Sequence, residues 1–245
     1  MEHEAFWLTG LFNKYLGSAL TSVLTSLGVK PADPAHPWEN WIVTEILVVA
    51  IIMVLFAALR SRLSVETPGK LQITFEAIYG FVTSQTRDAI EHGSAKYMSF
   101  FGALFIFILF MNLIGIIPGI EAPTMTPAVP LGLAISVFLY YHWAGLRAQG
   151  VGRYLVHFAG PMPYLFIIMV PIELISHLAR PLSLTIRLYA NMFAGEKVTM
   201  TFLSLTLVAI PSVFMGLHVF VAFLQAFIFM LLAMIYVGGA VAHEH

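Results

Sequence analysis

Long apolar runs dominate the chain, and the polar breaks between them mark out five segments long enough to cross a membrane. Trp41–Leu59 is a run of 19 residues with one charge, Glu45, and Tyr97–Ile117 is an uncharged run of 21 residues. About 20 apolar residues span a bilayer as a helix. We expect an all-α integral membrane protein with about five membrane helices, at about 41–60, 97–117, 130–147, 163–200 and 203–242.

The last two segments are longer than a bilayer is thick. Pro163–Lys197 is apolar but carries several charges, whereas Val198–Ala242 contains no Asp, Glu, Lys or Arg, and Pro211 is expected to divide or kink it. A helix over Pro211–Ala242 would be about 48 Å long at about 1.5 Å per residue, against about 30 Å of hydrocarbon. We therefore expect these two consecutive segments to form a long, strongly tilted hairpin.

Two further segments have helical apolar spacing with a polar opposite face. Phe6–Leu27 predicts an amphipathic helix that either lies on the membrane surface or packs against the rest of the protein. Residues 68–92 predict a second amphipathic segment, on the cytoplasmic side. We expect residues 1–40 to form an N-terminal amphipathic segment and loop, and residues 41–245 to form a single membrane domain.

Composition and charge support a membrane protein. Hydrophobic residues make up 59% of the chain and charged residues 10%, well below the roughly 25% of a soluble domain. The net charge of −1 gives no indication of a nucleic-acid partner, and the absence of cysteine excludes disulfides and thiolate metal sites. Lys and Arg gather at 60–96 and 147–153, so the positive-inside rule places these loops and the C-terminus in the cytoplasm and the N-terminus outside.

A polar stripe runs along the fourth apolar segment. At about 100° per residue, six residues share an arc of about 80°, namely Glu173, Ser176, Arg180, Ser183, Arg187 and Asn191. His177 falls at the edge of this arc and Glu196 on the opposite face. The last segment carries a sparser stripe of His218, Gln225 and Tyr236. Arginine in a bilayer is expensive and cannot lose its proton, so such residues mark ion paths or substrate sites.

Each stripe residue also has a structural interpretation. Arg187 could form an ion pair with Glu173 or Glu196, and Arg180 could reach the membrane interface. Tyr236 could be an interface aromatic, His218 a hydrogen-bonded core histidine, and Gln225 a partner across the hairpin.

Three classes of membrane protein compete as explanations of the pattern. A proton-coupled carrier needs intramembrane charges, but such carriers often have two related halves, and none is visible here. A haem protein could use His177 and His218 as ligands. A membrane hydrolase would need a motif such as H-E-x-x-H or G-x-S-x-G, and neither occurs.

The stretch RLYANMFAGE, Arg187–Glu196, resembles the signature of subunit a of F-type ATP synthases. Three other stretches resemble segments of the same family in the same order: PGKLQITFE from Pro68, FMNLIGIIPG from Phe110, and LHVFVAFLQAFIFMLLAMIYV from Leu217. The resemblance covers the chain beyond about residue 40. It implies a membrane stator beside a rotating ring of c subunits, reached by two separate aqueous half-channels.

The resemblance also implies residue roles. Arg187 would face the passing ring carboxylate, with Asn191 and Gln225 as near neighbours, and Glu196 and His218 would belong to the outer half-channel. Glu173, Ser176 and Ser183 would line the inner half-channel. His177 and Arg180 match the family less clearly and are not assigned.

The family context further implies partners and location. It predicts contacts with the c-ring, subunit b of the peripheral stalk, the rest of the ATP synthase and membrane lipid, with no nucleic acid. It predicts a multi-pass protein of a bacterial inner membrane, an organelle membrane being the less favoured alternative. We expect no cofactor, no metal and no catalysis by this chain alone, since it contains no phosphate-binding loop.

Overall fold

The computed structural model describes residues 6–26, 28, 33, 36–90, 93–117, 119–152, 154, 166–205 and 209–241. Within these residues there are seven α-helices and two short 3-10 helices, and no strand. The expected all-α membrane fold is therefore confirmed. Four helices are long and apolar enough to cross a membrane; α4, the fifth expected span, is apolar but has only 17 residues.

The helix bounds follow the apolar runs closely. In chain order they are α1 Trp7–Ser26, α2 Asn40–Ser61, α3 Lys70–Ala89, α4 Met98–Ile114, α5 Ala128–Gln149, α7 Phe166–Leu205 and α8 Ala209–Val241. The 3-10 helices are η1 Ser94–Lys96 and η2 Pro123–Met125. Helix α5 ends before Gly150, whose φ of 80° is a left-handed conformation that stops helices.

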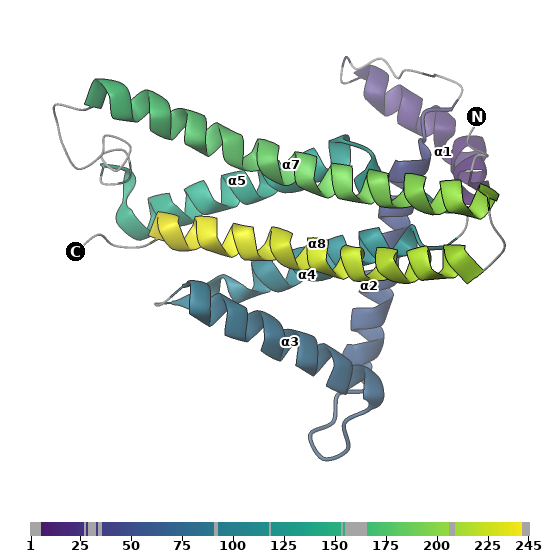
Figure 1. The fold of residues 1–245 in the computed structure, drawn as a ribbon, viewed down its shortest axis with the longest axis horizontal. Helices are drawn as coiled ribbons and strands as arrows, with labels where there is room; N and C mark the ends of the chain where they lie inside the picture. The colour runs from purple at the N-terminus through teal and green to yellow at the C-terminus, as the bar shows by residue number, and fades with distance from the viewer. Residues whose placement is uncertain are drawn as a thin grey trace.

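Helices α7 and α8 form the expected hairpin and run along the longest dimension of the molecule, while α2 crosses them (Figure 1). With 40 and 33 residues they measure about 60 Å and about 50 Å, so neither can stand upright in a bilayer about 30 Å thick. Helix α7 continues through Pro171 and Pro181, and the chain is helical again from Ala209, two residues before Pro211.

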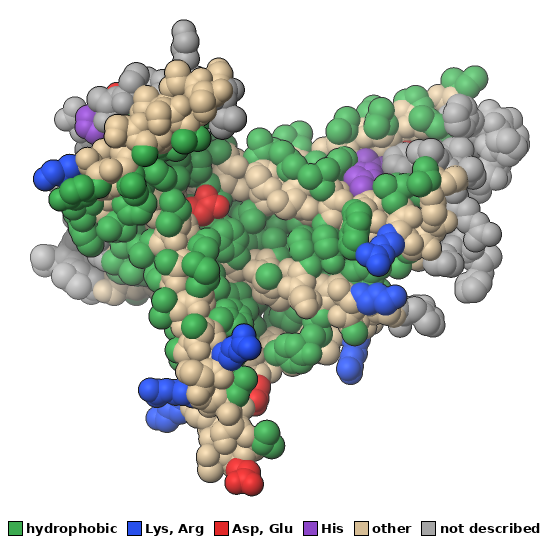
Figure 2. All heavy atoms as spheres, turned by 180° about the vertical axis from the view of Figure 1, so that it is seen from behind, with side chains coloured by type: hydrophobic (Ala, Val, Ile, Leu, Met, Phe, Trp, Pro, Cys, Tyr) green, Lys and Arg blue, Asp and Glu red, His purple; other side chains and the backbone are tan. Residues whose placement is uncertain are grey.

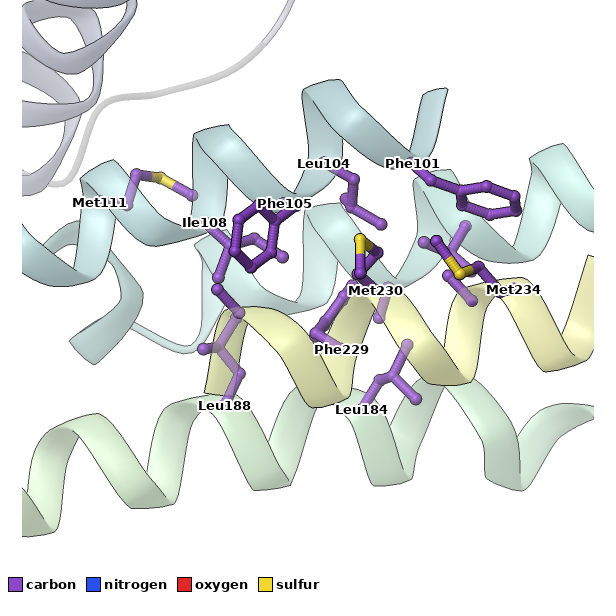
Figure 3. Packing of buried hydrophobic residues seen from close by; sticks show 14 of the residues in the cluster. Phe101, Leu104, Phe105, Ile108, Met111, Leu184, Leu188, Phe229, Met230 and Met234 are labelled. Atoms are coloured by element: carbon purple, nitrogen blue, oxygen red, sulfur yellow. The ribbon is translucent and has the colours of Figure 1, made fainter. Parts of the chain in front are cut away.

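The core lies around α8, which contacts α4, α5 and α7. Phe229, Met230 and Met234 of α8 pack between α4 and α7, as Figure 3 shows. Small residues on α8, including Ala222, Ala226 and Ala233, are fully buried and let neighbouring helices approach closely. The buried side of α7 thus packs closely against the core, and the polar stripe lies on the less buried side of the same helix.

Helix α1 is attached through the chain segment that precedes α2. The Asn13 amide donates to the Trp38 carbonyl (3.0 Å) and its oxygen accepts from the Trp38 backbone N–H (2.9 Å). Trp7 and Tyr15 of the same helix are each 69% exposed. Helix α1 therefore contacts the segment before α2 through Asn13, while Trp7 and Tyr15 lie at its surface. Figure 2 shows apolar side chains over much of this face, with Lys and Arg gathered mainly in two groups, one of them near the end of α2.

Candidate functional site

Two polar regions occupy opposite ends of the α7–α8 hairpin. Asn191 Nδ2 on α7 donates a hydrogen bond to Gln225 Oε1 on α8 (2.8 Å). Towards the other end, the Arg180 guanidinium lies 5.1 Å from the ring centroid of Tyr236. The two contacts are eleven residues apart along α7 and also eleven residues apart along α8. The antiparallel pairing of the two helices therefore keeps the same register from one contact to the other. They are separated by about 16 Å along the helix axis.

The first region is a groove of about 410 Å³ between the C-terminal half of α7 and the N-terminal half of α8. Asn191, His218 and Gln225 supply side-chain polar groups to its lining. His218 is 8% exposed, and its ring lies against Gly195, where an added Cβ would be 3.2 Å from Nδ1. Nε2 of His218 and Nε2 of Gln225 are buried without a hydrogen-bond partner among the described residues. Buried polar atoms of this kind are rare in structural cores and often belong to functional sites.

Glu196 lies beside this groove without lining it. It follows Gly195 on α7 and is 9% exposed, the most deeply buried carboxylate among the described residues. Its burial contrasts with the half-buried Arg187, as expected for opposite faces of the helix. The structure therefore groups Asn191, Gln225 and His218, with Glu196 adjoining them through Gly195.

Arg187 occupies the outward side of α7. All six residues of the predicted polar arc are half-buried or exposed, in contrast to Leu184 and Leu188 on the same helix. Within the described part of the chain, the Arg187 guanidinium has no ion pair and no hydrogen bond, so the structure does not contain a pair with Glu173 or Glu196. Its neighbour Ile186 is 55% exposed. A permanent cation thus lies on an uncovered polar stripe that has exposed apolar side chains beside it.

An apolar layer separates the two polar regions. Leu184 and Leu188 of α7 meet Phe229 and Met230 of α8, and none of the four is more than 1% exposed (Figure 3). By the register of the hairpin, Phe229 lies at the level of Arg187. Apolar side chains packed at this density leave no room for a continuous chain of water.

The second region lies between α7, α5 and the C-terminal half of α8. His177 Nε2 is 3.1 Å from Glu173 Oε1, and its Nδ1 is 2.7 Å from the Tyr141 hydroxyl. The Arg180 guanidinium lies over the rings of both Tyr141 (5.8 Å) and Tyr236 (5.1 Å). Tyr236 and Arg180 are thus part of an internal cluster here, a different placement from the interface aromatic and the interface-reaching arginine considered from sequence.

Sequence reasoning missed two members of this cluster. His177 follows Glu173 by four residues, a spacing that brings side chains together on a helix and could have identified the pair. Tyr141 reaches the pair from a different helix, and no spacing in the sequence indicates that contact. Of the two serines assigned to this side, Ser176 is half-buried and Ser183 is exposed.

The arrangement does not favour a metal or haem site. Among the described residues no three His, Asp or Glu side chains gather in a way that could hold a metal ion. Both ring nitrogens of His177 already contact Glu173 and Tyr141, so neither is directed at an iron. His177 and His218 also belong to opposite ends of the hairpin.

Comparison with known proteins places the chain in a family. The family model for the ATP synthase A chain matches residues 42–238. The chain belongs to the ATP synthase A chain family. An ATP synthase subunit a of Solibacter usitatus is 61% identical over 96% of this chain and 100% of its own length. The ATP synthase subunit a of Koribacter versatilis is 46% identical over 100% of this chain and 100% of its own length. That of Campylobacter jejuni is 42% identical over 86% of this chain and 94% of its own length.

The match to the ATP synthase A chain family covers the whole of the candidate site. It extends from the second residue after the start of α2 into the last turn of α8, so it includes the groove, the apolar layer and the second cluster. Helix α1 lies outside it. The family assignment favours an ATP synthase subunit over the carrier, haem protein and hydrolase alternatives.

Proposed function

We propose that this chain is the proton-translocating stator subunit of an F-type ATP synthase. It supplies two offset half-channels to the c-ring, and Arg187 separates them, so that proton flow drives ring rotation and ATP synthesis. The chain performs no nucleotide chemistry itself, and its partners are the c-ring, subunit b of the peripheral stalk and the rest of the complex. The bacterial relatives support a location in a bacterial inner membrane.

The position of Arg187 carries this proposal. A guanidinium without a partner, on a helix face surrounded by exposed apolar side chains, is costly in a membrane unless another chain supplies an anion. A ring carboxylate at about 4 Å would be favoured in its ionised form by about 4 kcal/mol at an effective dielectric of about 20. A c subunit that arrives opposite Arg187 therefore releases its proton.

The two polar regions are the basis for the two half-channels. We assign the groove with His218, and the adjoining Glu196, to the outer half-channel, and Glu173, Ser176 and Ser183 to the inner one. Asn191 and Gln225, hydrogen-bonded to each other, lie one helical turn from Arg187 towards the outer side. The apolar layer and the charge of Arg187 then oppose direct transfer of a proton between the half-channels.

The orientation follows from the charge distribution. The second polar region lies next to His142 of α5. His142 hydrogen-bonds (2.6 Å) to Tyr154, which lies just beyond the basic C-terminal end of that helix. The positive-inside rule places that end in the cytoplasm. The second cluster therefore belongs to the inner side and the groove to the outer side.

ATP-driven proton pumping in inverted membrane vesicles tests the proposal. Arg187→Ala is expected to abolish pumping although the complex still assembles, because ring carboxylates are no longer driven to release protons. Arg147→Ala is the matched control, since Arg147 is an exposed arginine that lies over Trp143 at the end of α5. Pumping at the wild-type rate by assembled Arg187→Ala complexes would refute the role given to Arg187.

A further inference from the structure

A carboxylate, an imidazole and a phenol form one continuous chain of contacts between α7 and α5. Glu173 Oε1 is 3.1 Å from His177 Nε2, and His177 Nδ1 is 2.7 Å from the Tyr141 hydroxyl oxygen. The imidazole is 6% exposed and Tyr141 is 1% exposed, whereas the Glu173 side chain is 32% exposed. The chain therefore begins at a carboxylate that water can reach and ends inside the helix bundle.

The chemistry of the three groups fixes the direction of their hydrogen bonds. An ionised carboxylate can only accept, so Nε2–H of His177 donates to Glu173. In the neutral imidazole Nδ1 is then the acceptor, and it accepts from the Tyr141 O–H. Tyr141 thereby holds the imidazole in the tautomer whose proton faces the carboxylate.

The groups around His177 define its electrostatic setting. On α7 it faces the carboxylate of Glu173 and the guanidinium of Arg180, one turn further on. From α5 it faces Tyr141 and His142, whose ring centroid is 5.1 Å away. From α8, the Tyr236 ring centroid lies 6.0 Å from that of Tyr141. Beyond the end of α5, the Tyr154 hydroxyl lies 2.6 Å from Nδ1 of His142. Glu173 and Arg180 are opposite in charge. Because the Glu173 carboxylate contacts the His177 imidazole directly, these two groups can share one added proton.

We propose that Glu173 and His177 act as a single proton-exchange pair at the mouth of the inner half-channel, with Tyr141 as its positioning residue. The inference rests on the proposed function. A proton from the cytoplasm adds to the pair, which then holds a carboxylate with an imidazolium or a carboxylic acid with a neutral imidazole. These two forms interconvert by moving one proton between Oε1 and Nε2. The pair gives the proton up again on the side of the ring.

The advantage of a pair over a lone carboxyl is its working pH. Among side chains, imidazole is the one whose charge ordinarily changes near neutral pH, whereas a carboxyl group is ordinarily ionised there. We therefore expect proton uptake through the pair to depend less steeply on cytoplasmic pH than uptake through Glu173 alone.

The test is the dependence of ATP-driven pumping on the pH of the medium around inverted vesicles, because the medium contacts the cytoplasmic face. Rates are normalised to the amount of assembled complex and to ATP hydrolysis by the detached catalytic sector at each pH. Between pH 6 and pH 7, the pumping rate of the His177→Gln complex should fall more steeply than that of wild type. The pumping rate of the Tyr141→Phe complex should also fall more steeply with rising pH than that of wild type. The pumping rate of the matched control, Tyr140→Phe, should follow the wild-type pH profile.

Combining variants separates a pair from two independent groups. If Glu173 and His177 act together, Glu173→Gln with His177→Gln should pump no more slowly than Glu173→Gln alone. A wild-type pH profile in assembled His177→Gln complexes would overturn the proposal. If the His177→Gln complex does not assemble, a wild-type pH profile in the Tyr141→Phe complex would overturn the proposal equally. Either result would leave the proposed function standing as long as Arg187→Ala abolishes pumping. Pumping by Arg187→Ala would instead reject the function itself.

Discussion

At the scale of single residues, the buried polar groups of the hairpin differ in whether this chain satisfies them. His177 contacts a partner at each ring nitrogen. In contrast, Nε2 of His218 and Nε2 of Gln225 are buried without a partner among the described residues, although Oε1 of Gln225 accepts a hydrogen bond from Asn191. An unsatisfied buried donor or acceptor lowers stability by about 1–3 kcal/mol. The unsatisfied nitrogen of His218 supports the proton-transfer role that we propose for this residue.

Replacement of His218 tests its role in the outer half-channel. His218→Ala should lower ATP-driven pumping by about tenfold or more, since a positioned proton-transfer group typically contributes about 10²–10⁴-fold to a rate and groove water replaces part of that. His36→Ala is the control, because His36 lies in a loop with its side chain 72% exposed. Unchanged proton flux in assembled His218→Ala complexes would contradict the assignment of His218 to the outer half-channel.

At the scale of elements, periodicity and length predicted the helices well because each apolar run must bury or embed its own surface. The length of α7 and α8 alone required a tilted hairpin. The contacts of Tyr141 and Tyr236 with Arg180 were not predictable in this way. They depend on the register between helices from different parts of the chain, and that register is set by close approaches at small residues.

Gly238 is one such close approach between α8 and α3. A Cβ at this position would lie 2.6 Å from the backbone oxygen of Ala89. Gly238→Ala should therefore separate the two helices and lower the thermal stability of the subunit by about 1–3 kcal/mol, the usual range for overpacking. Gly239→Ala is an adjacent control, since nothing lies within 4 Å of its added Cβ. Equal melting temperatures of the purified complexes would contradict this account of the α3–α8 contact.

At the scale of the whole molecule, the fold leaves one face of α7 uncovered and keeps two polar regions apart. The closely packed contacts of α8 with α4, α5 and α7 support the apolar layer at the level of Arg187. The resemblance to a family supplied the roles of Arg187, Asn191, Glu196, His218 and Gln225, and these roles stay predictions. The sequence could not show the apolar layer, because nothing in the sequence distinguishes Leu184 and Leu188 from exposed leucines such as Leu182.

We propose that Arg187 prevents protons from passing directly between the two half-channels. Passive proton flux into vesicles that contain the assembled complex tests it most directly, with an imposed potential and with no nucleotide to permit rotation. Each charge that crosses gains about 2.3 kcal/mol per 100 mV, so an open path would conduct readily. The account predicts a larger flux for Arg187→Ala than for wild type or Arg147→Ala. An Arg187→Ala membrane as tight to protons as wild type would contradict it.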